Sequence, residues 1–99
     1  MNLSVTIPPV RTFAGVEPNK AQALKPLEDA AEVFASWQAR EAARELHHGV
    51  VAASAALVDE CCDVITATCN LLAALGVDDL TEAMAECERR NEARGRYAD

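Results

Sequence analysis

The segment Val50–Leu75 constrains the fold most, because it runs for 26 residues with only three charged side chains. Those three are the acids Asp59, Glu60 and Asp63, which lie near its middle. About 20 apolar residues are enough to cross a bilayer. However, each acid near the bilayer centre would cost roughly 2.5–3.5 kcal/mol. We therefore predict no membrane span but a helix buried on most of its circumference within a helical bundle, with Gly76 as its C-terminal cap.

Length and composition favour one all-α domain. A chain of 99 residues has room for one domain. Hydrophobic residues make up 51% of it and aromatic residues only 4%, so small aliphatic side chains must build the core. A domain this short buries only roughly 60–65% of its unfolded surface. We therefore expect a helical bundle that is completed by oligomerisation, as a homodimer or a homotetramer.

The N-terminal part predicts an arm followed by a helix. Residues 1–17 contain two prolines and a glycine and show no helical period, so they predict an extended arm before a domain that spans residues 18–97. From Asn19, apolar residues recur every three or four positions and predict an amphipathic helix to about Arg40. Pro26 either kinks this helix or stands near the first position of its regular part.

Two polar segments flank the long apolar run. Gln38–His48 carries charges of both signs and ends at Gly49, and it is either a short exposed helix or a linker. Its adjacent histidines would point to different faces of a helix, which favours a surface linker over a zinc site. Asp79–Glu82 resembles a capping box and predicts a last helix through about Arg90.

Charge and cysteine content narrow the partners and the compartment. The chain has nine basic residues against sixteen acids, a net charge of −7, which argues against nucleic-acid binding. The opening MNLSVTIPPVRTF has neither a basic nor a long apolar region, so we expect no signal peptide and a cytoplasmic protein. Four cysteines outside any CxxC spacing are expected to be reduced core residues. They are Cys61, Cys62, Cys69 and Cys87.

The acids themselves suggest a metal site. Glu60 and Asp63 are three residues apart and share one helical face, and Asp29 and Glu32 have the same spacing on the earlier helix. Buried carboxylates are costly unless they are paired or bound to metal. Two such helices packed side by side would gather four carboxylates, an oxygen-rich cage that suits Mg²⁺ better than Zn²⁺.

These acidic segments resemble the MazG-like all-α nucleoside triphosphate pyrophosphohydrolases, a family that includes dimeric dUTPases and phosphoribosyl-ATP pyrophosphohydrolases. The family signature is EExxE, a spacer, then EExxD. Glu28–Glu32 is similar to the first half and Asp59–Asp63 to the second, with residues 33–58 between them. Aspartate stands at 29 and 59 where the family has glutamate. The resemblance covers residues 20–97, without the family's usual first helix.

The resemblance implies a reaction and a metal. It implies Mg²⁺-dependent hydrolysis between the α and β phosphates of a nucleoside triphosphate, which gives the monophosphate and pyrophosphate and removes non-standard nucleotides. The implied catalytic and metal-binding residues are Asp29, Glu32, Glu60 and Asp63.

The same resemblance suggests residues for the substrate. Candidates for phosphate contacts are Lys25, Arg89 and Arg94, and candidates for the base or sugar are Asn70 and Asn91. Trp37 with Phe34 would offer a stacking surface. Each also has a structural interpretation, because Trp37 and Phe34 suit a core, Asn70 suits helix packing, and an Arg-rich tail suits a helix C-terminus.

A second function class remains open from the sequence. The chain is alternatively a non-catalytic helical module that binds a partner or a nucleotide without turnover. A bound and hydrolytically competent Mg²⁺ would support the enzyme, whereas acids neutralised by Lys and Arg would support the module. The sequence leaves open the base, the sugar and the choice between dimer and tetramer.

Overall fold

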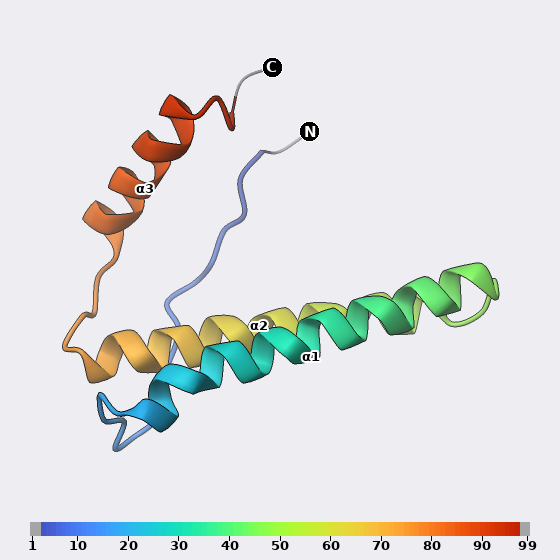
Figure 1. The fold of residues 1–99 in the computed structure, drawn as a ribbon, viewed down its shortest axis with the longest axis horizontal. Helices are drawn as coiled ribbons and strands as arrows, with labels where there is room; N and C mark the ends of the chain where they lie inside the picture. Colours follow the sequence, from blue (N-terminus) through green and yellow to red (C-terminus); the bar gives the residue numbers. More distant parts are fainter. Residues whose placement is uncertain (1–2, 98–99) are drawn as a thin grey trace.

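The computed structural model describes residues 3–97, and within that range the chain forms three helices and no strand. The helices are α1 (Lys20–Glu45), α2 (Val50–Ala74) and α3 (Thr81–Ala93) (Figure 1). This confirms the predicted all-α class. No helix among these residues is both long enough and apolar enough to span a membrane.

Helices α1 and α2 form an antiparallel hairpin and lie side by side along its length (Figure 1). The half-buried residues on each helix recur at alternating spacings of three and four, the spacing of a coiled-coil seam. On α1 they include Gln22, Pro26, Asp29, Val33, Ser36 and Arg40. On α2 they include Val50, Ala53, Leu57, Glu60, Val64 and Leu71, and the buried Ala67 continues the pattern. Several polar side chains therefore stand in the contact between the two helices.

The polar segment Gln38–His48 is mostly a continuation of α1. The predicted helix end near Arg40 is wrong by five residues, because the helix runs to Glu45. Ion pairs support this extension, since Arg44 Nε lies 2.9 Å from Glu41 Oε2 one turn earlier. The chain then reverses through Gly49, whose φ of 78° lies in the left-handed region that glycine adopts without strain.

The start of α1 decides between the two interpretations of Pro26. Asn19 caps the helix, because its side-chain oxygen accepts the Gln22 backbone N–H at 2.9 Å. The helix therefore begins six residues before Pro26, which lies inside it. Proline has no N–H to donate to the preceding turn, so the Gln22 carbonyl loses that helical bond.

Burial in the single chain is far lower than predicted. Among residues 3–97 only Ala67 and Asn70 are buried, so the prediction that α2 is enclosed on most of its circumference is wrong for one chain. Cys61 and Cys62 are exposed and are not core residues, although all four cysteines are free, as predicted. The physical reason is that α1 covers one side of α2 and the arm covers part of a second, while nothing in the described chain covers the rest.

Helix α3 packs against neither α1 nor α2. Residues 3–18 form no helix or strand; they pass the open end of the hairpin and run up toward α3 (Figure 1). The start of α3 differs from the predicted capping box. Asp79 accepts the Thr81 N–H at 2.9 Å and its hydroxyl at 2.7 Å, while Glu82 returns no bond among the described residues.

Candidate functional site

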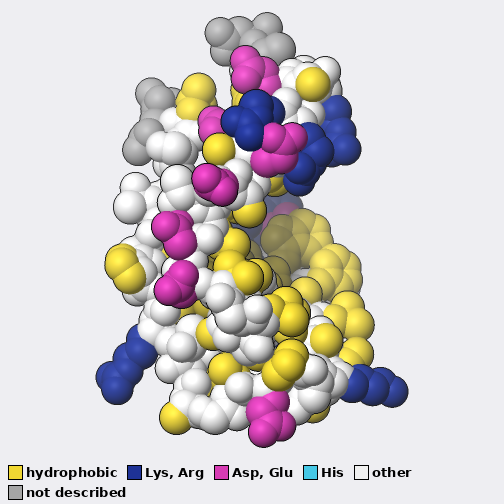
Figure 2. All heavy atoms as spheres, turned by 90° about the vertical axis from the view of Figure 1, so that its left-hand side faces the viewer, with side chains coloured by type: hydrophobic (Ala, Val, Ile, Leu, Met, Phe, Trp, Pro, Cys, Tyr) yellow, Lys and Arg dark blue, Asp and Glu magenta, His cyan; other side chains and the backbone are white. Residues whose placement is uncertain are grey.

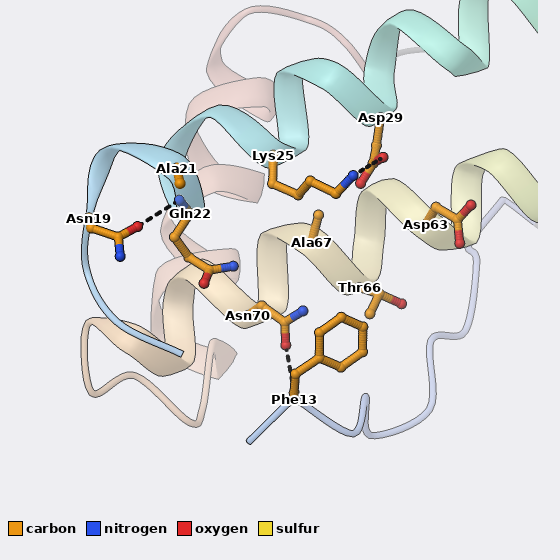
Figure 3. Close-up of a pocket in the computed structure, with 10 residues that line it drawn as sticks. All are labelled: Phe13, Asn19, Ala21, Gln22, Lys25, Asp29, Asp63, Thr66, Ala67 and Asn70. Carbon is orange, nitrogen blue, oxygen red and sulfur yellow. Dashed lines mark hydrogen bonds and ion pairs between the residues drawn. The ribbon is translucent and has the colours of Figure 1, made fainter. Parts of the chain in front are cut away.

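An open pocket of about 480 Å³ lies between the N-terminal half of α1, the C-terminal half of α2 and the arm (Figure 3). Four residues that the sequence singled out line it together, although they come from distant positions. They are Lys25 and Asp29 from α1, and Asp63 and Asn70 from α2. The antiparallel hairpin is what brings them together, because the first turns of α1 face the last turns of α2.

Asp29 is a well-shielded carboxylate in the pocket, and it has a cationic partner. Its side chain is 15% exposed, and its Oδ1 lies 3.3 Å from Lys25 Nζ. Lys25 also lies 3.9 Å from Glu28, a longer and more exposed contact. The spacing of four residues along α1 places Lys25 over Asp29, so the cation stands inside the pocket beside the carboxylate.

Asp63 lines the same pocket from α2, at its edge, and its carboxylate is directed away from Lys25 (Figure 3). It has no hydrogen bond or ion pair among the described residues. Glu32 and Glu60 lie outside this lining. Since the helices are antiparallel, the turn of α1 that carries Glu32 lies level with the turn of α2 that carries Glu60. Glu60 is half-buried and also has no partner within residues 3–97. The predicted acids therefore follow one another along one side of the hairpin.

The donor set of the pocket fits a weakly held Mg²⁺ rather than a complete protein cage. Within residues 3–97, no three His, Cys, Asp or Glu side chains lie close enough together to hold a metal ion. Two carboxylates, Asp29 and Asp63, share the pocket. Mg²⁺ commonly uses one or two carboxylates and fills its other positions with water and substrate phosphate. The residues present fit that arrangement.

Asn70 has a structural role that sequence reasoning left open. It is 2% exposed, the only buried polar residue among those described. Its Oδ1 accepts the Phe13 backbone N–H at 2.9 Å, which ties the arm to α2 (Figure 3). A buried amide that is satisfied in this way fixes the position of its partner segment.

Phe13 is a pocket residue that sequence reasoning missed. Its ring lines the pocket and remains 65% exposed, so one aromatic surface is free (Figure 3). The available signal was compositional, because it is one of only four aromatic residues in the chain and stands in the otherwise irregular arm.

The aromatic pair that the sequence nominated lies elsewhere. Phe34 and Trp37 stack on each other with ring centroids 6.0 Å apart and an interplanar angle of 13°. They do not line the pocket, and they are not core in the single chain, being 60% and 45% exposed.

The nominated residues of α3 are not brought to this pocket. Arg89 Nε lies 2.9 Å from Glu86 Oε2 on its own helix, and Arg94 caps the end of α3. Asn91 faces a second pocket of about 650 Å³, formed between α3 and the first residues of the arm. Their predicted contacts with a triphosphate remain predictions.

Comparisons of the chain with protein-family models, with curated proteins and with solved structures find no match. The geometry of the pocket is therefore the basis for a functional proposal.

Proposed function

We propose that this protein is a Mg²⁺-dependent nucleoside triphosphate pyrophosphohydrolase that acts in the cytoplasm as a homodimer or homotetramer. One observation carries the proposal: Asp29 and Asp63 line one pocket from two antiparallel helices, and Lys25 lies beside Asp29. Two carboxylates and an amine around a shared space are the groups that a metal-bound triphosphate needs. Glu32 and Glu60 extend the acidic side by one turn.

The carboxylates would bind the metal, and Lys25 would bind a phosphate. Mg²⁺ bound at Asp29 and Asp63 supplies charge neutralisation of the triphosphate and a more acidic bound water. Lys25, which pairs with Asp29 in the absence of metal, would be free to bind an outer phosphate if Asp29 held the ion. Glu32 and Glu60 would hold further waters in place by accepting hydrogen bonds from them. A chain with a net charge of −7 requires such cations before it can bind a polyanion.

Phe13 and Asn70 suit the base. The exposed ring of Phe13 offers a face on which a base can stack, the role that the sequence gave to Trp37. Asn70 holds the arm through its oxygen and leaves its amide nitrogen for a polar contact with the base or sugar. Arg89, Asn91 and Arg94 would reach this pocket only from the α3 of another copy.

The test is release of pyrophosphate from a panel of standard and modified ribo- and deoxyribonucleoside triphosphates, with and without Mg²⁺. We expect metal-dependent release, and we expect Asp63→Asn to lower kcat/KM by more than about 100-fold, since even outer partners of metal ligands contribute about 10–100-fold. Asp78→Asn is the matched control, because Asp78 lies in the loop before α3 and should leave the rate unchanged. Equal activity of wild type and Asp63→Asn would refute the metal assignment.

The second candidate is a non-catalytic helical interaction module, and the exposed apolar surface of the hairpin favours it. A well-folded sample that releases no pyrophosphate from any nucleotide in the panel would support this candidate over the enzyme.

A further inference from the structure

The two sides of the hairpin differ completely in chemistry. Lys25 and Asp63 line the same pocket, so they mark one side of both helices. At about 100° per residue, Phe34 lies roughly half a turn from Lys25, and Leu72 lies roughly half a turn from Asp63. The opposite side of the hairpin therefore carries Leu27, Phe34 and Trp37 from α1 and Val51, Val58 and Leu72 from α2. Within these stretches it has no charged residue, and we call it the uncharged side; Glu41 and Glu45 lie beyond it, toward the turn.

The uncharged side is open to solvent in the single chain. Leu27, Phe34, Val51 and Val58 are all at least 60% exposed. Figure 2, which looks along the hairpin from its open end, shows hydrophobic side chains gathered along the right-hand flank. Contiguous apolar surface of this kind marks an interaction site.

The total surface indicates how large the missing contact is. The chain exposes 8013 Å². An ordinary folded monomer of 10.6 kDa exposes about 5,500 Å², so this chain exposes about 2,500 Å² more. A standard interface removes about 800 Å² from each partner, whereas obligate homodimers bury about 2,000–5,000 Å² in total. The excess, to which α3 and the arm also contribute, exceeds what a standard interface removes from one chain.

We propose that the uncharged side binds a second copy of this chain, in a twofold arrangement with the axis parallel to the helices. A twofold contact places each surface against itself, so any charge on it would face or approach its own copy. The net charge of −7 lies outside this stretch. Glu41, two turns beyond Phe34 on the same side, is paired with Arg40 and Arg44. A second copy can therefore dock here without the repulsion it would meet elsewhere.

The sizes of the side chains also suit self-association. The α1 part of this side is bulky, with Leu27, Phe34 and Trp37. The α2 part near the turn is smaller, and Ala55 and Cys62 lie beside its two valines. A twofold axis parallel to the helices puts α1 of one copy over α2 of the other, so large side chains meet small ones twice. The pocket side stays open to substrate in this arrangement.

Sedimentation velocity on the full chain at several concentrations tests the proposal. We expect twice the chain mass of 10.6 kDa for the wild type. Phe34→Glu should raise the dissociation constant at least 100-fold, because each copy would bury a new unpaired charge. Ala35→Glu is the matched control: it adds the same charge at the next exposed position, on the pocket side, and should leave the dimer intact.

Val58→Asp provides a second variant from α2, and circular dichroism shows whether each variant keeps its helices. Labelling of the exposed Cys62 should be slow in the wild-type dimer and fast in both dissociated variants. A folded wild type that sediments as a monomer, or an Ala35→Glu variant that dissociates like Phe34→Glu, would overturn the proposal. Neither measurement involves nucleotide, so this result is independent of the proposed hydrolysis.

Discussion

The two sides of the α1–α2 hairpin share one backbone geometry but carry side chains of opposite character. The pocket side carries Lys25, Asp29 and Asp63 and is covered in part by the arm, whereas the uncharged side carries Phe34 and Trp37 and is covered by nothing in the described chain. The half-buried residues in the contact between α1 and α2 separate the two sides. The difference shows that the hairpin keeps its polar pocket residues and its exposed aromatic residues on separate sides.

Among the predictions that test this contrast, removal of the Asn70 side chain should have the largest effect on stability, because Asn70 ties the arm to the pocket side. We expect Asn70→Ala to lower the free energy of unfolding by about 1–3 kcal/mol, since it removes a buried amide and leaves the Phe13 N–H without its partner. Chemical denaturation followed by circular dichroism measures this change at a fixed protein concentration.

Proteolysis shows whether the arm is released as well. Arg11 is a trypsin site two residues before Phe13, so Asn70→Ala should speed cleavage there more than cleavage elsewhere. Thr66→Ala is the control, because Thr66 lines the same pocket but bonds only to the Cys62 carbonyl of its own helix. Equal cleavage rates at Arg11 in Asn70→Ala and the wild type would show that the arm is held by other contacts.

Helix periodicity was enough to predict the elements but not their surroundings. Spacing in the sequence predicted three helices, and it placed Asp29 and Asp63 on helical faces that the structure brings to one pocket. The end of α1 was missed by five residues, because Glu41 and Arg44 pair along a helix whose polar composition resembled a linker.

Residues whose position depends on tertiary contacts could not be predicted in this way. Phe13 reaches the pocket only because Asn70, 57 positions away, accepts its backbone N–H. Nothing local in the arm encodes that contact. Similarly, the apolar pattern of α2 predicted burial, but a pattern does not say whether the covering surface belongs to the same chain or to another one. Cys61 and Cys62 were therefore assigned to a core that a single chain does not form.

A smaller change in stability would show whether repulsion between the acids of the pocket side destabilises the fold. Glu60 is half-buried, lies among other acids and has no partner within residues 3–97. Like charges one helical turn apart destabilise by a few tenths of a kcal/mol, so Glu60→Gln should stabilise the metal-free protein by about 0.5 kcal/mol. For a domain of this size that is a rise of roughly 2–4 °C in Tm.

Differential scanning calorimetry without divalent cations and at fixed concentration measures this shift. The control is Glu82→Gln, the same substitution in the first turn of α3, where a negative charge is favourable to the helix dipole. That change should lower the stability slightly. A lower Tm for Glu60→Gln would mean that Glu60 makes a favourable contact, and the contrast between the two sides would then be one of packing rather than of charge.

The smallest expected effect concerns α3, which packs against neither helix of the hairpin and depends on its own cap. Hydrogen bonds from the Thr81 hydroxyl and then from the Thr81 N–H hold the pKa of Asp79 below its ordinary value. A lowered folded pKa stabilises the fold above the unfolded pKa, and this contribution is lost as pH falls through the folded pKa.

Acid should therefore loosen the first turn of α3 through Asp79, and amide NMR of Thr81 between about pH 6 and pH 2 would follow the carboxyl directly. We expect the Thr81 amide to titrate in the wild type and to lose that response in Asp79→Asn, while Asp78→Asn leaves it unchanged. If Asp78→Asn removed the response instead, the cap would be assigned to the wrong carboxylate. The three-way comparison then separates local capping in α3 from the charge effects on the hairpin, because the Thr81 amide reports only its own partner.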